Sequence, residues 1–98
     1  MTSIKEWQKR ITDYAVAHDF NWTPEDMDIM LLRIHSEVSE ASEAARDENK
    51  QELAEEMADI FIRLVNACEV MDIDLEAEVT KKHGKNLQRD KLHGRKRE

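Results

Sequence analysis

Apolar residues recur every three or four positions along most of the chain, a pattern typical of amphipathic helices. The first helix is expected to start at a capping box, because Ser3 is followed three residues later by Glu6. Thr23 and Pro24 are residue types typical of the start of a second helix. The apolar stripe expected on this second helix consists of Met27, Leu31, Ile34, Val38, Ala41 and Ala45.

A third helix is expected after the polar connector 47–50, and it carries two apolar stripes. One stripe consists of Leu53, Met57, Ile60, Leu64, Ala67 and Met71. The other stripe consists of Ala54, Ala58, Phe61, Val65 and Cys68. A helix that is apolar on two sides must be covered on two sides. We therefore expect one side to pack within its own bundle and the other against a second subunit.

A shorter fourth helix is expected to start after Asp72 or Asp74. It either ends at Gly84 or continues through it. The fold predicted from these four helices is an all-α, antiparallel four-helix bundle that forms a homo-oligomer, either a dimer or a tetramer.

The composition agrees with this fold. The 98 residues predict a single domain, 1–98, and they include only two Gly and one Pro, too few for a turn-rich β architecture. The single cysteine excludes an internal disulfide framework. The first residues lack the apolar core of a signal peptide, and no apolar run is long enough to span a membrane. A cytoplasmic location is therefore expected.

Charge is distributed unevenly along the chain. The net charge is −7, but residues 81–98 carry +6 and residues 1–80 carry −13. An acidic body argues against nucleic-acid binding, because contacts to phosphate dominate the affinity of such proteins. The basic end, with a tail from about residue 90 to 98, is either a solvated surface or part of a site that binds a cation and a polyanion together.

Two pairs of acids are placed for a joint role. Glu37 and Glu40 are three residues apart, as are Glu56 and Asp59, so each pair lies on one helix surface. Both pairs border the apolar stripe of their helix on the same flank. In an antiparallel hairpin centred in the connector, opposite positions sum to 96. This register sets Glu37 opposite Asp59 and Glu40 opposite Glu56.

Four converging carboxylates need a counter-charge, because two like charges about 4 Å apart repel by about 4 kcal/mol at an effective dielectric constant of about 20. Carboxylate oxygens favour Mg²⁺, Mn²⁺ or Ca²⁺ over zinc. A ferritin-like di-iron site is excluded, because the helices lack its Glu-x-x-His motif. The alternative is that the acids simply solvate the surface, as Glu43 is expected to do.

A cationic face is expected on the fourth helix if that helix continues through Gly84. Its members follow the spacing i, i+3, i+4, i+7 and are Lys82, Lys85, Asn86 and Arg89. Lysine offers a point charge to a phosphate, and arginine offers a two-pronged fork. Beside a metal, this face is a candidate triphosphate cradle; otherwise it is a solvated surface.

The two acidic pairs and the basic segment resemble the MazG-like family of all-α nucleoside triphosphate pyrophosphohydrolases. The family pattern of E-x-x-E, a spacer and E-x-x-D is similar to Glu37–Glu40 and Glu56–Asp59, and K-x-x-K-N-x-x-R is similar to residues 82–89. A later His-Gly-basic segment resembles residues 93–96, so that the resemblance covers roughly residues 7–96.

The resemblance implies an enzyme that cleaves a nucleoside triphosphate between its α- and β-phosphates. The four acids would hold Mg²⁺ and activate water, and the basic face would stabilise the leaving pyrophosphate. Trp22 would stack on the base, or it is a structural residue of its loop. Family members often assemble such sites from two subunits. The alternative function is a non-catalytic helical interaction or regulatory module on the same scaffold.

Overall fold

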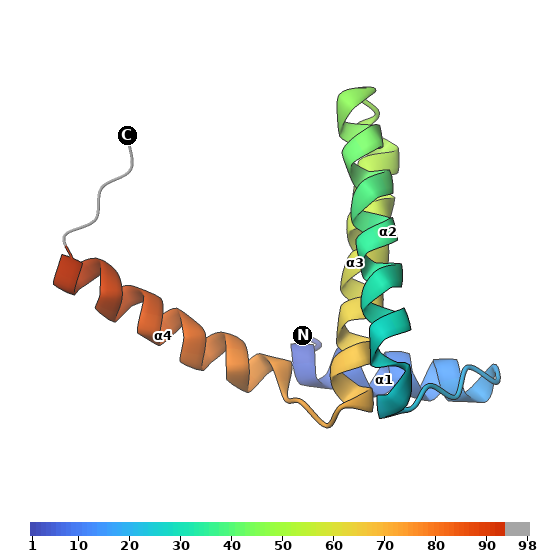
Figure 1. The fold of residues 1–98 in the computed structure, drawn as a ribbon, viewed down its shortest axis with the longest axis horizontal. Coiled ribbons are helices and arrows are strands. Elements are labelled where there is room, and N and C mark those ends of the chain that lie inside the picture. Colours follow the sequence, from blue (N-terminus) through green and yellow to red (C-terminus); the bar gives the residue numbers. More distant parts are fainter. Residues whose placement is uncertain (94–98) are drawn as a thin grey trace.

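In a computed structural model of the protein, residues 1–93 are described. They contain four α-helices and one short 3₁₀ helix, and no strand occurs within these residues (Figure 1). The elements are α1 (Ile4–Ala17), η1 (Pro24–Asp26), α2 (Met27–Arg46), α3 (Lys50–Val70) and α4 (Leu75–His93). The prediction of an all-α fold with four helices is confirmed, and the packing of the helices is consistent with a helical bundle.

The centre of the fold is a hairpin in which α2 and α3 run antiparallel and side by side (Figure 1). The polar connector joins them as predicted, and Asn49 caps α3 by accepting a hydrogen bond from the Glu52 amide at 3.1 Å. Small residues, Ala41 and Ala44 on α2 and Ala67 on α3, are buried, so that the two backbones can approach closely. The hairpin therefore supplies a closely packed frame for side chains along its edge.

The inner face of α2 is rotated from the predicted stripe. Leu31 and Val38 were expected inside but are 52% and 45% exposed, and Met30 and Ala44 are buried instead. Glu37 also faces inward, with a side chain only 14% exposed. The inner face of α2 therefore includes Glu37, paired with Arg63 of α3, where the predicted stripe was wholly apolar.

The second stripe of α3 is covered in part by the same chain. Val65 and Cys68 are buried, and α1 packs across α3 at this end of the hairpin (Figure 1). Ala54 and Ala58, nearer the start of α3, are exposed. The expectation that a second subunit covers this stripe is therefore wrong for its C-terminal half, and for the N-terminal half it stays a prediction.

Gln8 fixes α1 to the turn between α3 and α4. Its side chain is 2% exposed, and its amide nitrogen donates to Glu69 at 3.1 Å and to the Ile73 carbonyl at 2.9 Å. Its amide oxygen accepts from the Leu75 backbone N–H at 2.9 Å. A buried amide with these partners is satisfied, and it sets the point from which α4 departs.

The fourth helix starts at Leu75, with Asp74 accepting a hydrogen bond from the Ala77 amide at 3.1 Å, and it continues through Gly84. Its main contacts are with α1, and it extends away from the α2–α3 hairpin (Figure 1). The predicted basic tail begins inside this helix, which ends at His93. Residues 94–98, with most of the second basic segment, lie outside the described residues.

None of the helices in residues 1–93 combines the length and the apolar character needed to cross a membrane. The cytoplasmic location stays a prediction.

Candidate metal centre

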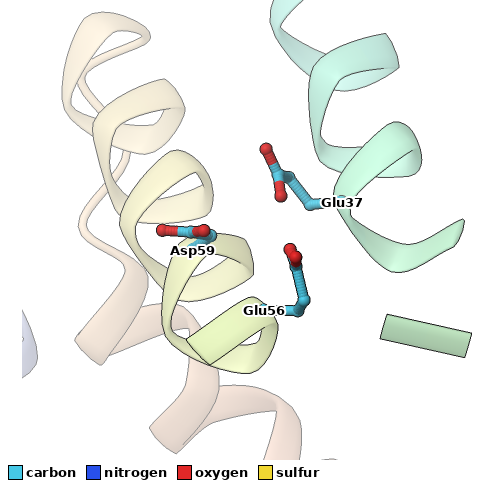
Figure 2. Close-up of side chains that lie close together, drawn as sticks. All are labelled: Glu37, Glu56 and Asp59. Carbon is cyan, nitrogen blue, oxygen red and sulfur yellow. The ribbon is translucent and has the colours of Figure 1, made fainter. Parts of the chain in front are cut away.

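Three of the four predicted acids meet between α2 and α3. Glu37 comes from α2, and Glu56 and Asp59 come from neighbouring positions on α3. One carboxylate oxygen from each lies within 4.8 Å of the others, and Figure 2 shows the three side chains close together. We call these three residues the carboxylate triad. The hairpin register that sums to 96 accounts for this meeting.

Glu40 lies beside the triad rather than within it. It is exposed, and its charge and a hydrogen bond both act on Glu56. A hydrogen bond with the Glu37 carboxyl group, burial, and the negative charges of Glu40 and Glu37 together raise the pKa of Glu56 to about 7. The arrangement therefore holds these carboxyl groups close enough together for their negative charges to repel one another.

One oxygen of the triad is left without a partner. Glu56 Oε1 is buried and has no hydrogen bond within the described part of the chain. Buried polar atoms normally have partners, so such an atom calls for a missing ligand. A hard divalent cation fits the all-oxygen donors of the triad, and it would satisfy this atom and offset the repulsion.

Arg63 of α3 forms an ion pair with Glu37 of the triad. Its Nε donates a hydrogen bond to Glu37 Oε2 at 3.0 Å, and its side chain is 38% exposed. Arg63 follows Asp59 by one helical turn, so both side chains lie on the same face of α3. The pair orients the Glu37 carboxylate from one side.

A cavity of about 300 Å³ adjoins the triad and shares Asp59 with it. Aromatic side chains from α1 and from the loop after it contribute to its wall, namely Tyr14, Phe20 and Trp22. Arg63 and Asn66 of α3 line it as well. A concave space with aromatic walls and a few polar groups is typical of a small-molecule site.

A smaller cavity lies next to this one, and its lining includes Trp22, Arg33, Arg63 and Asn66, which belong to both. The Arg33 guanidinium lies over the Trp22 ring, 5.3 Å from its centroid. This contact holds the indole in place beside the triad.

The predicted site residues are thus divided between two places. Trp22 lies in the wall of the cavity next to the triad. The predicted cradle residues, Lys82, Lys85, Asn86 and Arg89, are exposed on α4. Because α4 extends away from the hairpin, one chain does not bring these residues to its own carboxylates (Figure 1).

Arg33, Arg63 and Asn66 were not predicted from the sequence, although a signal for them exists. The register that placed the acids also sets Arg33 opposite Arg63, and Met30 opposite Asn66. All four line the smaller cavity. Extending the register by one and two turns beyond the acids would therefore have found this wall.

The hairpin and its carboxylate cluster define a class of all-α proteins with an acidic centre suited to a divalent cation. The family model of the MazG nucleotide pyrophosphohydrolase domain matches residues 25–93, and the chain belongs to this family. Membership indicates a nucleotide pyrophosphohydrolase in general terms. No curated protein and no solved structure gave a match to the chain.

Proposed function

We propose that this protein hydrolyses nucleoside or deoxynucleoside triphosphates between the α- and β-phosphates, giving the monophosphate and pyrophosphate, as a house-cleaning enzyme of the nucleotide pool. The observation that carries the proposal is the carboxylate triad, in which one oxygen of each residue lies within 4.8 Å of the others, in a chain of the MazG family. The aromatic cavity beside it supplies a place for a base.

The triad is proposed to hold Mg²⁺, or Mn²⁺ in its place. The unpartnered Glu56 Oε1 supports this choice, because an all-carboxylate donor set favours hard cations. Such an ion neutralises phosphate charge and makes bound water a better nucleophile. Glu40, exposed beside Glu56, is available to accept the proton of the attacking water.

Trp22 is proposed to stack on the base, because its ring lines the cavity and is held by Arg33. The α4 cradle (Lys82, Lys85, Asn86 and Arg89) is proposed to bind the leaving pyrophosphate. Since α4 extends away from its own hairpin, the cradle would serve the site of a second copy, and the proposal includes a homo-oligomer.

A screen of all common nucleoside and deoxynucleoside triphosphates with Mg²⁺, with detection of pyrophosphate, tests the reaction. Glu56→Gln is expected to lower turnover by at least about a hundredfold while the helical circular dichroism is unchanged. Glu43→Gln is the matched control, because Glu43 is exposed on α2 and is not part of the triad. Absence of pyrophosphate with every nucleotide, or full turnover by Glu56→Gln, would refute the proposal.

A further inference from the structure

Arg63 occupies the junction between the carboxylate triad and the aromatic cavity. It bonds to Glu37 of the triad at 3.0 Å and lines both cavities beside Trp22. A ligand that extends through the larger cavity, from the aromatic wall to Asp59 of the triad, therefore takes a path along this side chain. The base would occupy one end of that path, and the phosphates the other.

The guanidinium has donors to spare. Only its Nε takes part in the bond to Glu37, and neither Nη donates a hydrogen bond within the described part of the chain. Arginine has five N–H donors in a planar fork that matches two oxygens of a phosphate. With 38% of its side chain exposed, the group is accessible from the cavity.

The bond to Glu37 also limits where the fork can lie. Glu37 is 14% exposed, so it is a largely buried anchor on the opposite helix. A side chain held at one nitrogen loses less freedom when its remaining donors bind a ligand. Arg63 is therefore preorganised, in contrast to the exposed cations of α4.

We infer that Arg63 binds the phosphate group nearest to the sugar of the nucleotide, and so acts as a further catalytic residue at the α-phosphate. The inference rests on the proposed function and assigns one additional contact to the same site. The charge that develops on the α-phosphate oxygens during hydrolysis would meet a fixed cation there. The α4 cradle would serve the other end of the triphosphate.

Calorimetric titration without metal isolates this contact from catalysis. AMP, CMP, GMP and UMP, each paired with its own nucleoside, are the probes, and EDTA is present throughout. Wild type is expected to bind at least one monophosphate more tightly than its nucleoside. Arg63→Gln should lower the affinity for that monophosphate by about tenfold or more and leave the affinity for the nucleoside unchanged. Arg46→Gln, at the far end of α2, should change neither.

A purely structural role for Arg63 gives a different result. If the residue only supports Glu37, Arg63→Gln lowers the affinities for the monophosphate and the nucleoside equally or changes neither affinity. In either case the inference is wrong. Arg63→Lys keeps a cation beside Glu37 and serves if Arg63→Gln does not fold. It should lose part of the preference for the monophosphate because it lacks the fork. An unchanged preference overturns the inference.

The two proposals fail separately. If wild type releases pyrophosphate with Mg²⁺ but Arg63→Gln keeps the full monophosphate preference, only the contact is refuted. If wild type cleaves no nucleotide, the proposed function is refuted. If wild type also shows no preference for a monophosphate, the contact is refuted as well.

Discussion

Glu56 is the residue on which the neighbouring acids act most strongly. Its pKa is raised to about 7, first by the hydrogen bond with Glu37 and then by burial and by the charges of Glu40 and Glu37. An acid whose pKa is raised by folding binds its proton more tightly in the folded chain than in the unfolded one. The resulting contribution to stability is fully present when the pH is below the ordinary pKa of a carboxyl group, and it is lost as the pH rises through about 7.

The first prediction follows from that sign. In EDTA, the urea midpoint of wild type should fall between about pH 5 and about pH 8. The urea midpoint of Glu56→Gln should fall less over the same pH range, because the amide has no proton to lose there. Glu43→Gln, which leaves the triad intact, should behave as wild type does. If the urea midpoints of wild type and Glu56→Gln fall equally with pH, the crowding of acids around Glu56 does not affect folding.

The second prediction concerns the cation. Mg²⁺ should raise the melting temperature, and at about one hundred times its dissociation constant the gain in stability is about 2.7 kcal/mol. Near neutral pH and without metal, Glu56→Gln should melt no lower than wild type, because it removes repulsion. It should gain less from Mg²⁺ or Mn²⁺, because it removes a charged ligand.

Glu56 is a better choice than Glu37 for this test. Glu37 also accepts the hydrogen bond from Arg63 at 3.0 Å, so Glu37→Gln would remove an ion pair together with a ligand. Thermal melts with EDTA and with each metal measure both effects, with Glu43→Gln as the control. A response to Mg²⁺ in Glu56→Gln that equals wild type would remove Glu56 from the ligand set.

The meeting of the acids could be predicted from the sequence, because it depends only on helical spacing and on the position of the connector. The place of Arg63 depends on the same spacing and could have been predicted too. The exact side-chain geometry could not. Whether Glu40 joins the triad, or stays exposed beside Glu56, depends on rotamers that a helical register does not determine.

At the scale of the elements, three helices end in the same way without glycine. Asp19, Glu48 and Asp72 each follow a helix with a positive φ, of 68°, 55° and 59°. After α2, for example, the Asn49 amide donates to the Ala44 carbonyl at 2.9 Å, which is the long bond of a Schellman motif. Positive φ values are strained for residues that carry a Cβ atom. The connections are sharp even though the chain has only two glycines.

The third prediction uses this strain. Glu48→Gly should raise the free energy of unfolding by about 1 kcal/mol, because glycine adopts φ = 55° without steric strain. The strain that is relieved exceeds the destabilising effect of the entropy that glycine adds to the unfolded chain. Urea denaturation measures the change. Glu43→Gly, inside α2, should lower stability by about 1 kcal/mol. If both changes destabilise the protein, the conformation of Glu48 carries no strain.

Helix positions were predicted well because capping residues define them locally. Ser3 and Glu6 form the expected capping box, with the Glu6 amide donating to Ser3 Oγ at 3.1 Å. The rotation of α2 was not predictable from periodicity, because Leu31 and Val38 are as apolar as the residues that are buried. Glu37 lies on this inner face, where it accepts a hydrogen bond from Arg63 of α3 at 3.0 Å.

At the scale of the whole molecule, α4 makes the chain extended. The radius of gyration is 16.2 Å, whereas a compact domain of about this length has about 13 Å. Apolar side chains remain exposed on several helices, among them Leu32 at 66%, Met57 at 58% and Leu87 at 58%. Sequence periodicity predicted four helices but not the direction of the last one, because α4 makes few contacts with the rest of the chain.

The last prediction is that the protein forms a dimer or tetramer in solution. The uncovered part of α3 supports it, because Ala58, Phe61 and Ile62 line an apolar groove of about 330 Å³ together with Trp7 and Ile11 of α1. Burying apolar surface of this kind is the main driving force for association. Light scattering at micromolar concentration should therefore give at least twice the chain mass of 11.5 kDa.

Ala58→Glu places a charge in that groove, where association would bury it without a partner, so this variant should shift the mass toward 11.5 kDa. Ala45→Glu makes the same change at an exposed position near the end of α2 and should leave the mass unchanged. If the α4 cradle serves a second copy, Ala58→Glu should also lose pyrophosphate release, and Ala45→Glu should keep it. A wild-type chain that is monomeric and fully active would show that one chain completes its own site, and the extended position of α4 would then need another explanation.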